Sequence, residues 1–170
     1  TYADYKKHLA LILPNDVVQM DTVLGKINEP QAILTLLFEK SDLLIGLKLE
    51  NRNLLYVRQT LKRLCQYLGF EQYAKLFNIL LTDNGKEFQN PSFIDMYDNL
   101  GERISTVFYC DPYASWQKAK IENCHRLVRR VIPKGFSLKP FCQDHISLMC
   151  NHINSLKREY LNGLSAYEAF

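Results

Sequence analysis

Long apolar runs are missing from this chain of 170 residues. Apolar stretches such as residues 33–38 are bounded by charged residues within a few positions, whereas a membrane-spanning helix needs about 20 apolar residues. The sequence shows no signal-peptide pattern either. We therefore expect no membrane partner.

Cysteines are few and show no paired spacing. Their number is odd, and the five residues are Cys65, Cys110, Cys124, Cys142 and Cys150. Such a set fits reduced thiols in a cytosol better than a disulfide framework. The sequence therefore predicts a cytoplasmic protein.

Linkers, internal repeats and low-complexity segments are also missing from the sequence. With 47% hydrophobic residues, the chain can bury one core, and we predict a single domain over residues 1–170. The chain opens at Thr1 instead of Met and reaches a strand-like run at residues 17–23. We therefore expect this domain to be part of a longer protein.

Charge is unevenly distributed along the chain. The net charge is only +3, but residues 116–139 hold seven lysines and arginines and one acid, so the rest of the chain nets −3. Such asymmetry is typical of a surface that binds a polyanion, and a solvated helix face produces the same count about as often. Both interpretations stay open at this stage.

Hydrophobic periodicity predicts strands and then a helix in the first half. Between residues 16 and 51, three β-branched and aliphatic runs (17–23, 31–38 and 43–49) alternate with turn residues, as in a meander of strands. Residues 52–68 carry apolar side chains at every third or fourth position, which predicts a helix that Gly69 ends.

The rest of the chain alternates between strands and helices. We predict strands at 77–82 and 104–110, helices at 91–100 and 116–132, a turn or helix cap at Asp111-Pro112, and one or two helices over 138–170. The predicted order is βββαβαβαα. This order predicts an α/β domain with a five-stranded sheet flanked by helices.

Three acids in this pattern are candidates for chemistry. Asp21 lies inside a strand whose neighbours predict burial, where an unpaired carboxylate is costly. Asp83 follows an apolar strand at its carboxyl end, where open α/β sheets place ligands, and Glu122 lies on a polar stripe of its helix. Each also has an ordinary explanation: a hydrogen-bonded strand residue, an Asp-Asn-Gly turn, and an i, i+4 pair with Lys118.

Together the three acids predict a metal site. Two strand carboxylates and one helix carboxylate suit divalent cations, because Mg²⁺ prefers carboxylate oxygens, water and substrate phosphate oxygens as ligands. Without metal, the three like charges would repel one another. Two ions about 3.5–4 Å apart stabilise the attacking and leaving oxygens of an in-line phosphoryl displacement. We therefore expect Mg²⁺ as the cofactor, with Mn²⁺ as a substitute.

Longer strings surround these acids. They are residues 18–25 (VQMDTVLG), 81–88 (LTDNGKEF), 111–123 (DPYASWQKAKIEN) and 129–135 (RRVIPKG). The first string resembles the first motif of a known family, the retroviral-integrase-like DDE recombinases. The second string resembles the second motif of that family, and the last two resemble the third. The resemblance covers nearly the whole chain and is specific to bacterial transposases of the insertion-sequence-thirty type.

The chain departs from the family pattern at a few positions. Ala119 stands where Gly is frequent, and Ala166 stands where Pro is common in the tail motif. In addition, 38 residues separate Asp83 from Glu122, where many relatives have fewer. We expect a loop near residues 90–102 to absorb the difference.

The resemblance implies an RNase H-like fold with a mixed five-stranded sheet and the catalytic core of a DNA transposase. Asp21, Asp83 and Glu122 would be its metal ligands. Water would cleave DNA at the element ends, and the freed 3′-hydroxyl would attack target DNA.

The resemblance also implies DNA partners, namely the terminal inverted repeats and the target, and self-association in an active complex. We expect a helix-turn-helix region that reads DNA sequence N-terminal to Thr1, and a place near the nucleoid in a bacterial cytoplasm. The residues expected to contact the DNA backbone are Lys118, Lys120, Arg126, Arg129 and Arg130. Two aromatic residues ahead of them, Tyr113 and Trp116, would either stack on an unpaired base or pack within the protein.

Other functions remain open. An RNase H-like nuclease or resolvase uses the same type of carboxylate cluster, since fold does not determine function. A catalytically silent DNA-binding or dimerisation module derived from a transposase would bind DNA without cutting it. A zinc site at Cys142, His145, Cys150 and His152 is a further alternative, but the spacing lacks the close cysteine pairs of structural zinc sites and favours core thiols and surface histidines.

Overall fold

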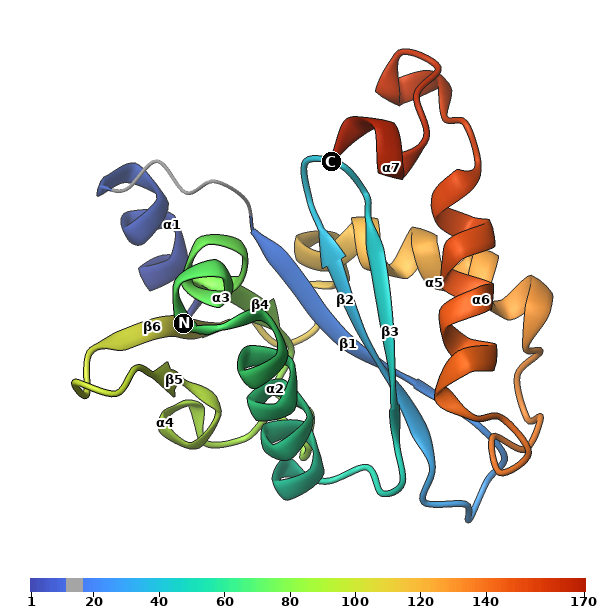
Figure 1. The fold of residues 1–170 in the computed structure, drawn as a ribbon, viewed down its shortest axis with the longest axis horizontal. Helices are drawn as coiled ribbons and strands as arrows, with labels where there is room; N and C mark the ends of the chain where they lie inside the picture. The colour runs from blue at the N-terminus through green and yellow to red at the C-terminus, as the bar shows by residue number, and fades with distance from the viewer. Residues whose placement is uncertain (12–16) are drawn as a thin grey trace. The chain divides into compact units, whose positions relative to one another are not determined.

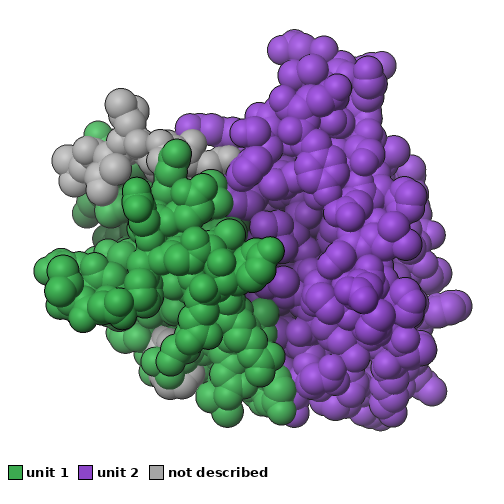
Figure 2. Space-filling model, in the orientation of Figure 1, with its two compact units in different colours: residues 1–18, 53–118 green, residues 19–52, 119–170 purple. Residues whose placement is uncertain are grey.

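A computed structural model describes residues 1–11 and 17–170 of the chain. Contacts between residues divide the chain into two compact units (Figure 2). Unit 1 comprises residues 1–18 and 53–118, and unit 2 comprises residues 19–52 and 119–170. The single domain expected over residues 1–170 stays a prediction.

Three strands form the sheet of unit 2, in the order β3-β2-β1 (Figure 1). They are β1 (Val18–Leu24), β2 (Ala32–Phe38) and β3 (Leu44–Leu49). β2 and β3 are antiparallel. All seven residues of β2 are buried, as expected of an inner strand.

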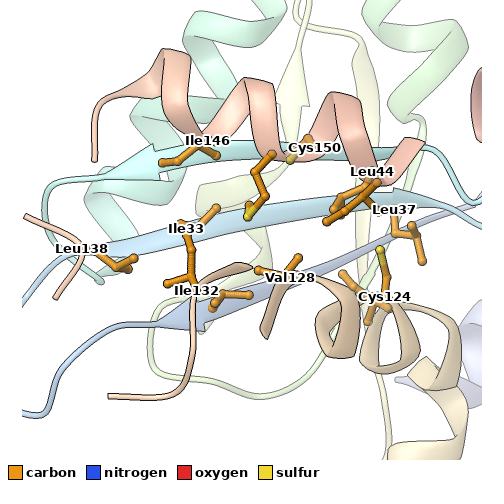
Figure 3. Packing of buried hydrophobic residues seen from close by; sticks show 13 residues of the cluster. Ile33, Leu37, Leu44, Cys124, Val128, Ile132, Leu138, Ile146 and Cys150 are labelled. Carbon is orange, nitrogen blue, oxygen red and sulfur yellow. The ribbon is translucent and has the colours of Figure 1, made fainter. Parts of the chain in front are cut away.

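Two helices, α5 (Ala119–Val131) and α6 (Gln143–Ser155), supply the other side of the unit 2 core. α5 contacts β2 and α6, and α6 contacts β3. Figure 3 shows Ile33 of β2 among Val128 of α5 and Ile146 and Cys150 of α6. α6 packs so closely on β3 that a Cβ at Gly46 would lie 2.8 Å from both Cys150 Sγ and Ile146 Cγ2. The unit ends in a 3₁₀ turn (Glu159–Leu161) and the short α7 (Ala166–Ala169).

Three strands also lie in unit 1, in the order β4-β6-β5. β4 (Ile79–Thr82) is parallel to β6 (Arg103–Tyr109), and β5 (Met96–Tyr97) is antiparallel to β6. The mixture of parallel and antiparallel pairs confirms the predicted mixed sheet.

The helices of unit 1 are α1 (Tyr2–Leu11), α2 (Leu54–Leu68), α3 (Phe70–Phe77) and α4 (Pro91–Ile94). The Asn53 side chain caps the start of α2, and Gly69, with φ 82°, ends it. A buried cluster with residues from β4 and β6 forms part of the core of this unit: Tyr5, Val17, Ile79, Leu81, Phe108 and Cys110.

The structure confirms the α/β class and most of the predicted elements, with three corrections. The described residues contain six strands where five were predicted, because Met96 and Tyr97 pair with β6 inside a segment predicted as helix. The helices α1 and α3 were not predicted, and α3 shortens the strand expected at residues 77–82. The start of the first predicted segment, residue 16, lies outside the described residues.

The added strand has a tertiary cause. The Asp95 side chain accepts a hydrogen bond from the Val107 backbone N–H at 3.0 Å, so the chain leaves α4 and runs beside β6. Local periodicity does not report such a contact.

None of the helices in the described part of the chain has the length and hydrophobicity of a membrane span.

Candidate active site

Asp21 is the middle residue of β1, in which Met20 and Val23 are buried. Its own side chain is half-buried, and Oδ1 accepts a hydrogen bond from the Thr22 backbone N–H at 2.7 Å. The strand therefore brings this carboxylate to the boundary of the core, where the ionised form avoids the cost of full burial.

Gln19, two residues before Asp21, ties β1 to the helix that carries Glu122. Its buried Oε1 accepts the Ile121 backbone N–H at 2.9 Å, and its Nε2 donates to Glu39 Oε1 at 2.7 Å. Ile121 lies in the first turn of α5, where backbone N–H groups have no partner within the helix. Gln19 therefore caps α5 from the neighbouring strand.

A second polar link joins β1, β2 and α5. Thr35 Oγ1 on β2 donates to the Asp21 carbonyl oxygen at 3.0 Å and lies 2.9 Å from His125 Nε2. His125 is three residues after Glu122, on the same helix. The stretch of α5 around Glu122 is thus held at two points by buried polar side chains of the sheet, which satisfies their hydrogen-bonding groups.

Replacing Gln19 with Ala is expected to destabilise unit 2 and to weaken any activity of Glu122. The change leaves the Ile121 N–H without its partner, which costs about 1–3 kcal/mol of unfolding free energy. Urea denaturation measures this cost. The matched control is Gln66→Ala, at an exposed position of α2. Equal stability of the two variants would show that Gln19 does not cap α5.

Glu122 is exposed in the first turn of α5, whose apolar face buries Ile121, Cys124 and Val128. No hydrogen bond or ion pair joins its carboxylate to another described residue, so the i, i+4 pair with Lys118 considered from the sequence is not formed. The positive end of the helix dipole favours a carboxylate at this position. Glu122 is therefore a carboxylate open to a ligand.

Ile132, the residue after the end of α5, continues the buried face of the helix. It lies four residues after Val128, and its backbone N–H donates to the Val128 carbonyl oxygen at 2.9 Å. Val131 is 55% exposed.

Asp83 is the first residue after β4, whose four residues are all buried. Its Oδ1 accepts the Gly85 backbone N–H at 2.9 Å, which closes the turn, and 48% of its side chain is exposed. A Cβ on Gly85 would lie 3.0 Å from Asp83 Oδ1 and 3.1 Å from Glu87 Oε2. Gly85 thus lets two carboxylates approach the same turn, and Glu87 was not foreseen there.

Lys118 binds the second carboxylate oxygen of Asp83. Its Nζ donates to Asp83 Oδ2 at 3.0 Å, and only 5% of the lysine side chain is exposed. A buried ammonium requires a negative partner, so this ion pair holds both groups in place. The position favours a role of Lys118 at the carboxylate over the contact with DNA backbone expected from the sequence.

The loop before Lys118 is closed by a reciprocal pair. Gln117 Oε1 accepts the Asp111 N–H at 2.8 Å, and Gln117 Nε2 donates to Asp111 Oδ2 at 2.9 Å. Two aromatic residues lie between Asp111 and Gln117 in the sequence. Tyr113 is 102% exposed and Trp116 is 73% exposed. Neither ring is buried by the described residues, and the loop presents both to solvent.

The Gly85 turn yields a second prediction. Gly85→Ala should reduce any metal-dependent activity about tenfold or more while changing stability by less than about 1 kcal/mol, because the new methyl group displaces Asp83 and Glu87 and not the backbone. Cleavage rate and thermal midpoint are measured together. Gly101→Ala is the control with the opposite pattern: φ there is +82° with open space around it, so strain lowers stability and spares activity.

The other four basic residues predicted to bind DNA lie on α5. Lys120, Arg126 and Arg130 are exposed, although Lys120 Nζ also donates to Asp42 Oδ1 at 2.9 Å. Arg129 is half-buried, its Nη2 donates to the Leu24 carbonyl oxygen at 2.9 Å, and burial lowers the pKa of its guanidinium. These four residues belong to unit 2, as do Asp21 and Glu122, whereas Asp83 and Lys118 belong to unit 1.

The zinc alternative finds no support. Cys150 is buried in the core, where burial raises the pKa of its thiol to about 11, while Cys142 is exposed with its Sγ 3.3 Å from His145 Nδ1. Within residues 1–11 and 17–170, no three His, Cys, Asp or Glu side chains gather into a group that could hold a metal ion. The prediction of a core thiol is confirmed for Cys150 and wrong for Cys142, which is exposed, while His145 and His152 lie at the surface as predicted.

Curated bacterial transposases are similar to the chain over most of its length. The transposase for insertion sequence element IS4351 of Bacteroides fragilis is 27% identical over 154 residues, which are 90% of this chain and 44% of that protein. The transposase InsI for IS30C of Escherichia coli is 29% identical over 132 residues (76% and 31%). The transposase for IS1086 of Cupriavidus metallidurans is 34% identical over 89 residues (52% and 25%). The chain spans less than half the length of each of these relatives.

Solved structures of viral integrases share the fold. A chain of the simian T-cell lymphotropic virus intasome, in complex with PP2A regulatory subunit B56 gamma, has a TM-score of 0.66 at 15% identity, covering 92% of this chain and 54% of that one. The catalytic core domain of BIV integrase has a TM-score of 0.59 at 20% identity (89% and 91%). The HTLV-2 integrase catalytic core domain, in complex with magnesium in a trimeric form, has a TM-score of 0.57 at 12% identity (92% and 96%).

The integrase structures establish only the fold of this chain, because their sequence identities to it are 20% or lower. The similarity in sequence is to the transposases. No protein-family model matches the chain. The fold is RNase H-like, as the sequence motifs implied. The chain thus resembles the DDE catalytic core of the retroviral-integrase-like superfamily, and within it the bacterial transposases of the insertion-sequence-thirty type.

Proposed function

We propose that this chain is the catalytic core of a DNA transposase, which cleaves DNA at the ends of an insertion element and joins the freed 3′-hydroxyl to target DNA. The observation that carries the proposal is the similarity to insertion-sequence transposases along 90% of the chain. The position of each acid supports it: Asp21 stands at the boundary of the core, Asp83 at the carboxyl end of β4, and Glu122 in an exposed helical turn.

We propose Asp21, Asp83 and Glu122 as the ligands of Mg²⁺, or of Mn²⁺ in its place. The donor set fits these ions in its chemistry, because hard divalent cations take oxygen ligands and all three side chains are carboxylates. Metal binding would have to draw the three acids together, since no three metal-ligating side chains of the described residues form a group in this structure. The Glu122 carboxylate has no partner among the described residues, and nearly half of the Asp83 side chain is exposed. When bound, two such ions stabilise the attacking and leaving oxygens of phosphoryl transfer.

The chain's own residues position these acids. Gln19 and His125 hold the turn of α5 that carries Glu122, and Gly85 holds the turn that carries Asp83. The Lys118 ammonium lies 3.0 Å from Asp83 and offsets its charge, so the carboxylate is held in one place before substrate arrives. Such preorganisation avoids an ordering cost during the reaction.

Basic residues on α5 supply the contacts to DNA in this proposal. Lys120, Arg126, Arg129 and Arg130 contact the phosphate backbone, with an affinity that falls as salt rises. Tyr113 and Trp116, both exposed, offer faces on which an unpaired base can stack. The active assembly contains more than one copy of the protein and acts in the bacterial cytoplasm.

The test uses the full-length protein that contains this chain and duplexes carrying the element ends. Nicking and strand transfer in Mg²⁺ or Mn²⁺, and neither reaction without metal, are the expected results. DNA binding with no cleavage in either metal would instead assign a silent binding module. Cleavage of any branched or unrelated duplex without strand transfer would assign a nuclease or resolvase.

A further inference from the structure

A polar cavity of about 370 Å³ lies in unit 2, beside the residues of α5 that follow Glu122. Its volume is within the range of small-ligand pockets. The residues that bear on its chemistry are Asp42, Lys120, Cys124, Arg126, Arg158 and Tyr160. Arg158 and Tyr160 lie far from α5 in the sequence, so only the fold brings these groups together.

Arg158 is the unusual member of this cavity. It is 8% exposed, and its side chain makes one hydrogen bond, from Nη2 to the Ile153 carbonyl oxygen at 3.2 Å. Its Nη1 is buried without a hydrogen-bond partner among the described residues. A guanidinium is always charged and carries five N–H donors, so one neutral carbonyl leaves it largely uncompensated.

The nearby carboxylate does not pair with Arg158. Asp42 Oδ1 accepts from Lys120 Nζ at 2.9 Å, and Asp42 Oδ2 accepts from the Tyr160 hydroxyl. Arg126 Nη2 donates to the neutral Asn123 Oδ1 at 2.6 Å. The cavity therefore contains one neutralised cation, Lys120, and two arginines without a carboxylate.

The remaining titratable groups of the cavity add no negative charge. Cys124 is 7% exposed and belongs to the hydrophobic core cluster of unit 2, so it adds no carboxylate to the cavity. Burial and the bond to Asp42 raise the pKa of Tyr160 to about 12, so its phenol stays protonated. The cavity thus has an excess of positive charge that an anion would balance.

We infer that this cavity binds a phosphate group of the DNA backbone, with Arg158 and Arg126 as its ligands. Arginine matches phosphate with paired N–H donors, which suits this ligand. This assignment rests on the proposed function. It adds a site at Arg158, a residue that no sequence motif had connected with DNA.

The position of Arg126 indicates DNA as the source of the phosphate. Glu122 and Arg126 are both exposed and four residues apart on α5, so their Cβ atoms are about 5–6 Å apart on one face of the helix. DNA bound at Glu122 therefore also passes Arg126. The exposed ring of Tyr160 at the same cavity offers a surface for the adjoining sugar or base.

The experiment measures DNA affinity at several salt concentrations for the full-length wild type, Arg158→Gln and Arg126→Gln. The matched control is Arg63→Gln, at an exposed position of α2 outside the cavity. Loss of one phosphate contact reduces the slope of log K against log salt by about 0.9. We expect this reduction, with roughly tenfold weaker binding at low salt, in both cavity variants and not in the control.

Two further measurements separate the possible outcomes. Arg126→Gln changes an exposed residue, so it still reports on the cavity if Arg158→Gln fails to fold, and Arg158→Lys should recover part of the slope. The thermal midpoint in inorganic phosphate tests the other source of the ligand. A midpoint shift that Arg158→Gln removes, combined with unchanged DNA slopes, would overturn the DNA assignment in favour of a free phosphate.

Failure of this inference is distinguishable from failure of the proposed function. Unchanged slopes in both cavity variants, in a protein that still nicks element ends, would overturn the cavity assignment alone. Reduced slopes in a protein that never cuts DNA would support the cavity site and contradict the transposase proposal.

Discussion

Glu122→Gln is expected to abolish metal-dependent cleavage of element ends while leaving fold and DNA binding intact. The amide keeps the size of the side chain but removes the negative charge that a hard cation requires. Metal stabilisation of a phosphoryl-transfer transition state amounts to several kcal/mol, so a loss on the order of a thousandfold or more in rate follows. Gel assays of nicking at saturating DNA measure the rate.

Stability should fall by less than about 1 kcal/mol in this variant, because Glu122 is exposed without a partner among the described residues and only its interaction with the helix dipole is lost. Asp83→Asn should lose activity to the same extent. It should also lose some stability, because Lys118 then faces a neutral amide. The control is Glu159→Gln, another exposed glutamate of unit 2. Full activity of Glu122→Gln would falsify the assignment of this residue as a metal ligand.

Ile33→Ala is expected to lower the unfolding free energy by about 2–5 kcal/mol, the largest stability effect that we predict. Ile33 is fully buried on β2, in the cluster that joins the sheet to α5 and α6 (Figure 3). Truncation removes apolar contacts and leaves a cavity that close packing cannot fill. Urea denaturation followed by circular dichroism measures the change.

Two controls test the cause of this loss. Ile33→Val removes one methylene and should cost about 0.5–1.5 kcal/mol. Ile27→Ala, at a residue that is 84% exposed, should stay within about 0.5 kcal/mol of the wild type. The prediction fails if Ile33→Ala and Ile27→Ala are equally stable.

Local patterns were sufficient for most of the secondary structure. β2 and β3 begin and end within one residue of their predicted bounds, because an apolar run bounded by turn residues is visible in a short window of sequence. A short window of sequence did not predict α3. Gly69 was taken as the end of a helix, and the structure shows that it is also the residue at which the next helix begins. The same window also missed β5, which pairs only because β6 is beside it.

The candidate site was predictable only in part for the same reason. The positions of Asp83 after a buried strand and of Glu122 on an exposed helical stripe followed from local spacing. The partners of these residues did not: Lys118 is 35 residues from Asp83, and Gln19 is 102 residues from Ile121. A charged or polar residue in the sequence carries no sign of which distant group it will meet.

The sequence by itself determined the strand and helix periods, the turns after the acids and the likeness to transposases, since each depends on residues that are near one another in the chain. Only the tertiary structure decided that Lys118 is buried against Asp83, that Gln19 caps α5, and that Arg158 shares a cavity with Arg126. Those contacts arise when the core closes. Burial then makes each polar group depend on whichever partner the fold places beside it.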